Sequence, residues 1–285
     1  MTMKNNEVKK EFDVTRIKFE SFLENLTKSW SFQRPLTESI VYSLFTGGKR
    51  YRPVLMIKAY EAFSGKEADE AILLFASAIE VLHTYSLVHD DLPCMDDDDY
   101  RRGQLTCHKK FGEDIAVLTG DALLNMAYEL IFSAIKESGY NKNFIDAFGL
   151  FSTLTGAGGL IGGQVADLSF DKNSATIKDV EYIFTHKTCD LIAVALTGGA
   201  MLADASEEIV DGIKDYAYNF GFAFQIADDI LDGESDGCSI LHVVDESKAK
   251  ELLADYTQKA INALNGIENT EFFKEFALMA QNRIE

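Results

Sequence analysis

Proline is scarce in this chain: only Pro35, Pro53 and Pro93 occur among its 285 residues. Because proline removes a backbone donor and breaks helix interiors, its scarcity allows long helices to run without interruption. Between turn signals the apolar residues recur at helical spacing, as in residues 68–91, and no convincing strand-like alternation or Pro/Ser-rich linker occurs. The sequence therefore predicts an all-α fold, with residues 1–285 forming a single domain of about ten helices.

Two further helix predictions depend on local signals. One helix is predicted to begin with Thr119 as its N-cap and to stop at Gly139. Another falls in the uncharged run 147–166, which is long enough to cross a bilayer but contains six glycines among its twenty residues. We expect a buried helix there, packed closely on its neighbours, rather than a transmembrane span.

Composition narrows the classes of ligand. Hydrophobic residues make up 47% of the chain, enough for a sizeable core, and the net charge is −19. So negative a chain is not expected to bind nucleic acid or an anionic membrane through general electrostatics. A small anionic ligand fits only where cations are gathered locally.

Cysteine usage and the first residues bear on location. The four cysteines form no CxxC pair, and the first twelve residues contain no apolar signal-peptide segment. We therefore expect a cytoplasmic protein with reduced thiols and no stable membrane anchor.

An acidic cluster surrounds Pro93. It comprises Asp90, Asp91 and residues 96–99. In an uninterrupted helix, Asp90 and Asp96 would point about 240° apart. Since Pro93 disfavours helical geometry at the preceding residue, we expect the helix to end here and Asp96 to fold back toward Asp90. Residues 97–99 can also be a solvated flank.

A second acidic cluster, Asp228, Asp229 and Asp232, follows an apolar segment. Asp228 and Asp232 are four residues apart, so about 40° separates them around a helix and both leave the same face. Two like charges on a largely hydrophobic face are unfavourable unless a cation lies between them. Carboxylates without histidine or cysteine partners are typical of Mg²⁺ sites, which substrate phosphates complete.

Basic residues gather at three places. GGKRYRP supplies Lys49, Arg50 and Arg52, YRRG supplies Arg101 and Arg102, and HKT supplies Lys187. Each alone is explained as well by a surface ion pair as by a ligand. Beside two aspartate clusters, all three together predict a site for a phosphorylated ligand.

Seven motifs follow one another between residues 47 and 232: GGKRYRPVL, HTYSLVHDDLPCMDDDDYRRG, TCHKKFG, LTGDALL, GGQVADL, HKTCDLI and FGFAFQIADDILD. This ordered set resembles the trans-isoprenyl (polyprenyl) diphosphate synthases, especially the bacterial farnesyl diphosphate synthases. The resemblance implies a large helical bundle around a central apolar cavity, and a homodimer. It also implies a prenyltransferase that condenses isopentenyl diphosphate with dimethylallyl or geranyl diphosphate to give farnesyl diphosphate.

The resemblance further implies roles for single residues. His83 is a candidate only through its place seven residues before Asp90, because an isolated histidine is more often a core or surface residue. The implied metal ligands, which would bind three Mg²⁺ ions or Mn²⁺, are Asp90, Asp96, Asp228 and Asp232. The catalytic set is Asp90, Asp91, Asp96, Arg101, Lys187 and Asp228. The allylic diphosphate is assigned to Arg101, Lys187, Thr188 and Gln225, and isopentenyl diphosphate to Lys49, Arg52, His83 and Arg102.

Product length in this family depends on the residue five places before the first aspartate, which is Tyr85 here. On a helix its ring would project more than one turn below Asp90, toward the interior. A large ring at this position resembles the C15-forming members, although a core aromatic fits it equally. Geranylgeranyl diphosphate synthesis is the alternative.

One segment departs from the family. After Asp232 the family usually has a loop with a Gly-Lys pair, whereas residues 233–247 contain no lysine. If this deletion is real, we expect weak activity or a non-catalytic subunit.

Two other enzyme classes share part of this pattern. The dipeptide His89-Asp90 is typical of metal phosphohydrolases, but the five histidines supply no further metal-binding pattern. A terpene cyclase shares the aspartate motif, yet it would not need a second diphosphate site such as Lys49, Arg52 and His83.

Overall fold

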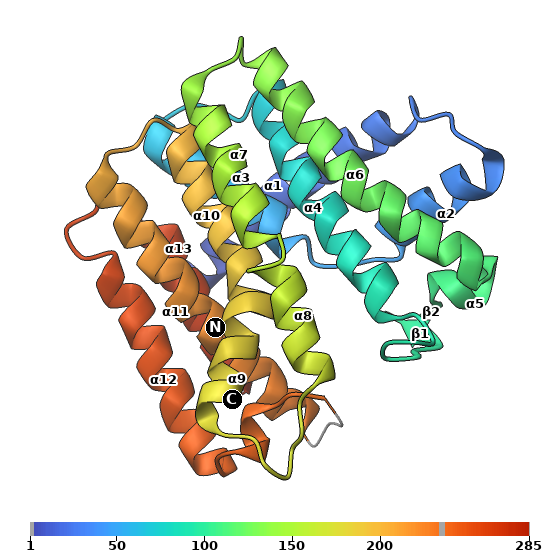
Figure 1. Ribbon diagram of the computed structural model, residues 1–285. Coiled ribbons are helices and arrows are strands. Elements are labelled where there is room, and N and C mark those ends of the chain that lie inside the picture. Colours follow the sequence, from blue (N-terminus) through green and yellow to red (C-terminus); the bar gives the residue numbers. More distant parts are fainter. Residues whose placement is uncertain (1–2, 234–236, 285) are drawn as a thin grey trace.

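The computed structural model describes residues 3–233 and 237–284, and these residues are almost entirely helical (Figure 1). The predicted all-α fold is confirmed, with thirteen α-helices in the described ranges instead of about ten. A short hairpin that the sequence pattern did not predict pairs Tyr100 with Leu105 and Arg101 with Gln104. The elements are α1 (Met3–Thr27), α2 (Arg34–Phe45), α3 (Tyr51–Ser64), α4 (Glu70–Asp90), β1 (Tyr100–Arg101), β2 (Gln104–Leu105), α5 (Cys107–Phe111), α6 (Glu113–Glu137), α7 (Lys142–Leu154), α8 (Leu160–Leu168), α9 (Ile177–Ile183), a π-helix (Phe184–Cys189), α10 (Asp190–Leu202), α11 (Glu207–Asp232), a 3₁₀ turn (Ile240–His242), α12 (Glu246–Ala263), α13 (Glu271–Gln281) and a last 3₁₀ turn (Asn282–Ile284).

Two helix boundaries differ from the sequence-based expectation. Helix α6 begins at Glu113, and Thr119 is buried inside it. Its hydroxyl donates to the carbonyl of Ile115 and does not accept from a backbone amide as an N-cap would. The run 147–166 is not one helix, because a turn between Leu154 and Leu160 divides it into α7 and α8. The glycines that excluded a membrane span there also break the helix.

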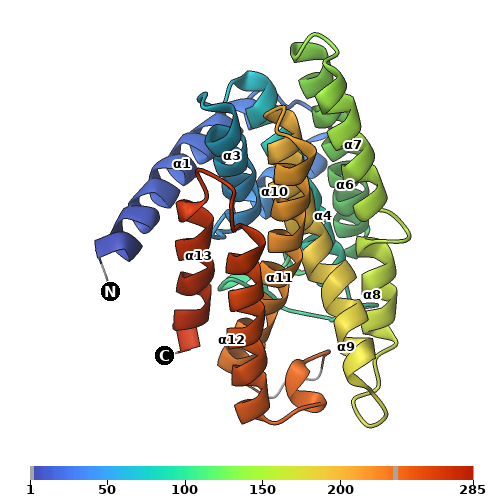
Figure 2. The ribbon, with the colours of Figure 1, turned by 90° about the vertical axis from the view of Figure 1, so that its left-hand side faces the viewer.

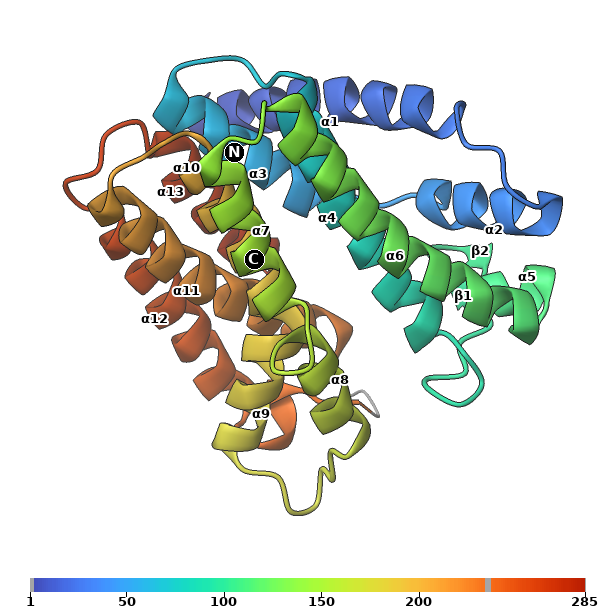
Figure 3. The same cartoon turned by 45° about the horizontal axis from the view of Figure 1, so that its top comes forward.

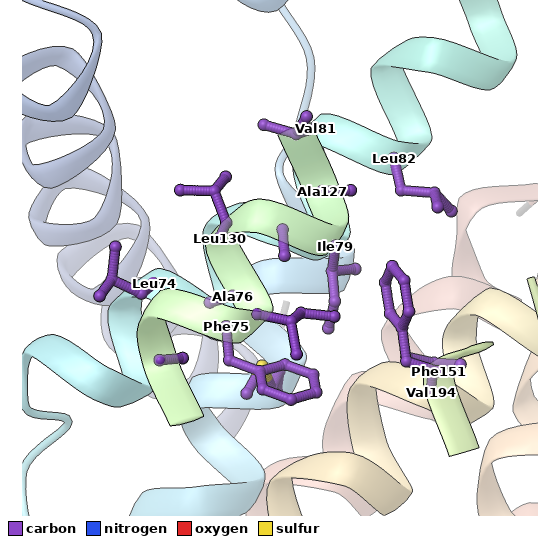
Figure 4. Packing of buried hydrophobic residues seen from close by; sticks show 14 of the residues in the cluster. Leu74, Phe75, Ala76, Ile79, Val81, Leu82, Ala127, Leu130, Phe151 and Val194 are labelled. Atoms are coloured by element: carbon purple, nitrogen blue, oxygen red, sulfur yellow. The ribbon is translucent and has the colours of Figure 1, made fainter. Parts of the chain in front are cut away.

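Helix α4 is the centre of the larger core. Its apolar side chains are buried almost completely: Phe75 and Ile79 have no exposed surface. They pack against α6, α7 and α10, which contribute residues such as Leu130, Phe151 and Val194 (Figure 4). Each buried side chain of this size stabilises the fold by roughly 1.5–3 kcal/mol. The helix is therefore a rigid support for whatever stands at its end.

A second core joins α1, α3, α10, α11, α12 and α13. Helix α10 lies against α3 so closely that a Cβ on Gly199 would meet the carbonyl oxygen of Met56 at 2.5 Å. Helices α11 and α13 close the same cluster around Tyr216 and Phe273. In Figure 2, α1 and α13 lie on one side of α10 and α11, and in Figure 3, α4 and α6 run side by side on the other.

Two helices, α4 and α6, are long and apolar enough to cross a bilayer by length and composition. The apolar window of α4 is 72% buried inside the protein, whereas that of α6 is 44% buried. The composition of α4 is therefore explained by its place in the core.

Candidate active site

The first acidic cluster stands where α4 ends. The helix stops at Asp90, three residues before Pro93, and the amide of Asp96 donates to the carbonyl of Asp90 at 2.9 Å. The predicted return of Asp96 toward Asp90 is thus confirmed. Burial raises the pKa of Asp90 to about 6; Lys187, whose Nζ lies 4.0 Å from Asp90 Oδ2, opposes this shift, and Asp96 adds to it.

Asp91 belongs to a different set of contacts. Its side chain is 5% exposed and accepts from Nε of Arg101 at 2.6 Å, with Nη2 of the same arginine at 2.5 Å. Arg101 also contacts Asp98 at 3.3 Å. Asp91 therefore holds an arginine, while Asp90 and Asp96 approach a lysine.

The hairpin explains why adjacent arginines diverge. Arg101 lies in β1, whereas Arg102 and Gly103 form the turn with positive φ values of 53° and 76°, as in a type I′ turn. Arg102 reaches the carbonyl of Gly47 with its Nη1. The two side chains thus serve different parts of the site.

Lys187 and Thr188 lie on the π-helix between α9 and α10. Such widened turns occur often at functional sites. Lys187 forms an ion pair with Asp167 of α8 at 2.5 Å. Burial lowers the pKa of Lys187, but Asp90 and Asp167 more than offset this, so the net shift is upward and the ammonium stays charged. Thr188 donates to Gln225 of α11 at 2.9 Å.

A buried carboxylate directly after the π-helix connects it to a neighbouring helix. Asp190 is 1% exposed; it contacts Nδ1 of His186 at 2.8 Å and accepts from the hydroxyl of Tyr218 at 2.8 Å. This network joins the π-helix to α11. It therefore fixes the backbone that carries Lys187.

The second acidic cluster ends α11, and its three aspartates differ. Asp229 is buried and accepts from the amide of Ile240 at 2.7 Å, which ties the following segment back to the helix. Burial raises the pKa of Asp228, Arg283 opposes this shift, and Asp232 adds to it. Asp232 is exposed. Asp228 and Asp232 are thus the accessible pair.

A cavity of about 560 Å³ gathers the predicted cations. It is lined by Lys49, Arg52, His83 and Arg102, together with Asp228. Arg52 Nη1 lies 3.3 Å from His83 Nε2, and the buried Nε of Arg52 has no hydrogen-bond partner among the described residues. Burial, with Arg52 and Arg102 adding to it, lowers the pKa of His83 well below its usual value and keeps the imidazole neutral.

Arg50 also lines this cavity, but its guanidinium is already paired within the protein. Its guanidinium is 3% exposed and pairs with Glu80 at 2.5 Å, while donating to the carbonyl of Leu44 at 2.6 Å. The residue therefore anchors the start of α3. It leaves Lys49 exposed at the cavity.

A second, more apolar cavity of about 260 Å³ adjoins the first. Arg52 and His83 line both cavities, so the two are neighbours. Asp90, Lys187 and Thr188 line the apolar cavity, as do Leu160, Gln164 and Leu191. Tyr85 is half-buried there, with its ring edge-to-face on His89 at 5.1 Å.

The donor set fits Mg²⁺. Asp90, Asp96, Asp228 and Asp232 offer only carboxylate oxygens, the ligands that this ion prefers. Asp90 and Asp228 each stand beside a cationic side chain, Lys187 and Arg283 respectively. Each of these two carboxylates therefore already has a positively charged neighbour in the protein.

Residues 33–259 match the family model described as polyprenyl synthetase. This chain belongs to the polyprenyl synthetase family. The synthetase is 40% identical over 215 residues to a farnesyl diphosphate synthase from Bacillus subtilis, in an alignment covering 75% of this chain and 72% of the relative. It is 39% identical over 257 residues to geranylgeranyl pyrophosphate synthase 7 from Arabidopsis thaliana, covering 88% and 71%. A solved geranyltransferase structure from Legionella pneumophila superimposes with a TM-score of 0.88 at 29% identity, covering 98% of each chain.

Several residues of the synthetase's site were not predicted from sequence. Asp167 lies in the motif GGQVADL, and the sequence pattern assigns no role to it. Glu80 and Arg283 carry no local signal, because their partners Arg50 and Asp228 lie 30 and 55 residues away in the chain. Asp190 has one partner four residues away, His186, but its contact with Tyr218 spans 28 residues. Only the packed helices bring these pairs together.

Proposed function

We propose that this polyprenyl synthetase is a farnesyl diphosphate synthase, which condenses isopentenyl diphosphate with an allylic diphosphate. The observation that carries the proposal is the junction of the two cavities at Arg52 and His83. One cavity is basic and suits a diphosphate; the other is largely apolar and suits a prenyl tail. Two diphosphate substrates must meet side by side in such a reaction, and few other reactions require that arrangement.

The allylic diphosphate is assigned to the mouth of the apolar cavity. Lys187 and Thr188 line this cavity, and Gln225 is bound to the Thr188 hydroxyl. Arg101 lies outside the lining of both cavities, where Asp91 at the end of α4 holds it, and we assign it to the same diphosphate from the family resemblance. Asp90, Asp96, Asp228 and Asp232 would hold Mg²⁺. The bound metal supplies charge neutralisation for the departing diphosphate.

Isopentenyl diphosphate is assigned to the basic cavity, with Lys49, Arg52 and Arg102 as its cations. His83 lies among them as a neutral imidazole because its pKa is lowered by burial. It would therefore contribute a hydrogen bond without adding charge. The unpartnered Nε of Arg52 is a further donor available to the ligand.

The reaction follows from this division. The C–O bond of the allylic substrate breaks, and its electron pair leaves with the diphosphate, whose charge Lys187 and Arg101 stabilise. The double bond of isopentenyl diphosphate supplies the electron pair of the new C–C bond. A proton then leaves to the released diphosphate and restores a double bond. The apolar walls, including Leu160 and Leu191, exclude water from the cation.

The proposed product is the C15 chain, because the Tyr85 ring lines the apolar cavity close below Asp90. A geranylgeranyl diphosphate synthase is the second candidate. It is favoured by the relative of that name, which aligns with more of this chain than the farnesyl diphosphate synthase does.

The proposal extends to assembly and location. We propose one cytoplasmic domain that forms a homodimer. Helix α6 supports the dimer, because Val117, Leu118 and Phe132 are 42%, 55% and 60% exposed on it. Light scattering on Phe132→Glu should give the monomer mass, while the equally aromatic control Phe32→Glu keeps the dimer mass. A wild-type monomer would contradict this assembly.

The shortened connection after Asp232 bears on activity. Residues 234–236 lie outside the described part of the chain, so the expected deletion falls partly there. The amide of Ile240 binds Asp229, and a short segment is enough to return to α11. We propose an active enzyme, with a non-catalytic subunit as the outcome if condensation fails.

One assay tests the reaction. Purified protein with Mg²⁺, labelled isopentenyl diphosphate and geranyl diphosphate should form an acid-labile C15 product, and Asp90→Asn should abolish it. Phosphate release without condensation would support a phosphohydrolase instead. Absence of any turnover from folded protein would support the non-catalytic subunit.

A further inference from the structure

Three side chains outside the proposed catalytic set converge beside the hairpin. One ligand atom each from Asp97, Asp99 and His108 lies within 4.8 Å of the other two. The aspartates follow Asp96 on the acidic loop, whereas His108 is on α5. This cluster contains none of Asp90, Asp96, Asp228 and Asp232.

The hydrogen bonds of His108 fix its tautomer. The hydroxyl of Thr106 donates its single proton to the carbonyl of Asp98 at 2.8 Å. The same oxygen lies 3.1 Å from Nδ1 of His108, so there it must accept, and Nδ1 carries the proton. With a proton on Nδ1, Nε2 is the nitrogen that can act as a metal ligand. The neutral ring is the form in which histidine binds a metal.

This nitrogen faces negative charge. The His108 side chain is 3% exposed, and its Nε2 is buried with no hydrogen-bond partner among the described residues. The nearest carboxylate oxygen is that of Asp97 at 4.0 Å, too far for a hydrogen bond. A buried acceptor opposed to two carboxylates is unfavourable unless a cation lies between them.

The two aspartates make the cluster accessible from solvent. Their side chains are 61% and 60% exposed, so an ion can reach the cluster from solvent while His108 forms its floor. Lys109 lies 2.7 Å from Asp99, but it is itself 37% exposed and can swing away. One imidazole nitrogen with two carboxylates is a donor set for a divalent transition metal rather than for Mg²⁺.

We propose that Asp97, Asp99 and His108 form a binding site for a divalent transition-metal ion such as Zn²⁺, separate from the catalytic aspartates. The ion joins the acidic loop to α5. Because Arg101 and Arg102 follow the loop directly, it restrains the hairpin that carries both. The site does not depend on the proposed reaction, since none of its members contacts the two cavities.

Calorimetric titration of metal-free protein with Zn²⁺, in a large excess of Mg²⁺, tests the site. Wild type should bind one equivalent, and X-ray absorption should detect an imidazole nitrogen on the zinc. His108→Gln and the double variant Asp97→Asn/Asp99→Asn should each weaken binding at least tenfold. The exposed double variant keeps the test valid if the buried histidine is needed for folding.

The matched control is Asp98→Asn, which removes one charge from the same loop without touching the cluster. It should bind zinc as wild type does. Equal affinity of wild type and the double variant would overturn the proposal, as would zinc binding that Asp98→Asn weakens as strongly. Loss of the zinc equivalent in Asp90→Asn, with retention in the double variant, would assign the ion to the catalytic aspartates and likewise overturn it.

Discussion

Arg283 Nη1 lies 2.8 Å from Asp228 Oδ1, so a side chain from the end of the described chain contacts a proposed metal ligand on α11. The guanidinium also stands over the ring of Phe224 at 5.3 Å. Both side chains of the ion pair are less than a third exposed, at 28% and 29%. Arg283 therefore occupies the position that a cation would otherwise share with Asp228.

Arg283→Gln should tighten metal binding in the absence of substrate. The competing ion pair is partly screened, so its loss is worth about 0.2–1 kcal/mol, which corresponds to a gain in metal affinity of about 1.4-fold to fivefold. Mn²⁺ titration followed by electron paramagnetic resonance measures the change. Arg34→Gln, which breaks an exposed pair with Glu38, is the control and should leave the affinity unchanged. Weaker Mn²⁺ binding in Arg283→Gln would show that the arginine supports the site instead of competing for it.

Metal affinity should depend on pH through Asp90. Its pKa is raised to about 6 by burial, so in metal-free protein it holds a proton below that pH, and metal must displace the proton. The Mg²⁺ affinity should therefore fall about tenfold per pH unit below 6. The free energy of unfolding of the metal-free protein should change with pH in the opposite direction. The raised pKa of Asp90 contributes stability that is present in acid and is lost as the pH rises through about 6.

Asp167→Asn separates this effect from general acid sensitivity. The negative charge of Asp167 raises the pKa of Asp90 directly. Asp167 also forms an ion pair with Lys187 and so competes with Asp90 for the ammonium group that lowers the pKa of Asp90. Removing the charge of Asp167 thus lowers the pKa of Asp90 by both routes. The acid limb of the Mg²⁺ affinity, measured by calorimetry, should move to lower pH. An unchanged limb would mean that a group other than Asp90 controls it.

The sequence predicted the helical class and the fold-back at Pro93 because both depend on short-range rules. Helix periodicity and the geometry before proline act within a few residues. Helix boundaries were less predictable. Thr119 has the chemistry of an N-cap, but it lies inside α6, where its hydroxyl donates to the carbonyl of Ile115 and contacts the hydroxyl of Ser39 on α2. Tertiary packing decided between the two uses of the same side chain.

The residue types of the candidate site were predictable from the sequence, but the contacts between its side chains were less so. Asp90 and Asp91 are neighbours with the same chemistry, yet one faces Lys187 and the other is buried against Arg101. Arg50 and Arg52 divide in the same way, since Arg50 is buried with Glu80. These choices depend on which face of a helix meets which neighbour, and that is settled only when the helices pack.

Asp91→Asn should distinguish a positioning carboxylate from a metal ligand. Asp91 accepts from Arg101, so losing its charge should raise the KM for the allylic diphosphate by roughly tenfold to a hundredfold, from about 1.5–3 kcal/mol in a charge-assisted hydrogen bond. Mg²⁺ affinity measured without substrate should change little, whereas Asp90→Asn should lose it. A parallel loss of Mg²⁺ affinity in both variants would make Asp91 a ligand.

Tyr85→Ala should lengthen the product. The ring is half-buried in the apolar cavity against His89, and its removal opens space for the growing tail one helical turn below Asp90. Chromatography of the dephosphorylated products should change from mainly C15 to mainly C20 and longer. The control Phe32→Ala removes a partly exposed ring outside both cavities and should keep C15. If Tyr85→Ala still releases C15 alone at undiminished rate, the ring does not limit the chain, and the cavity wall formed by Leu160 and Leu191 becomes the next surface to vary.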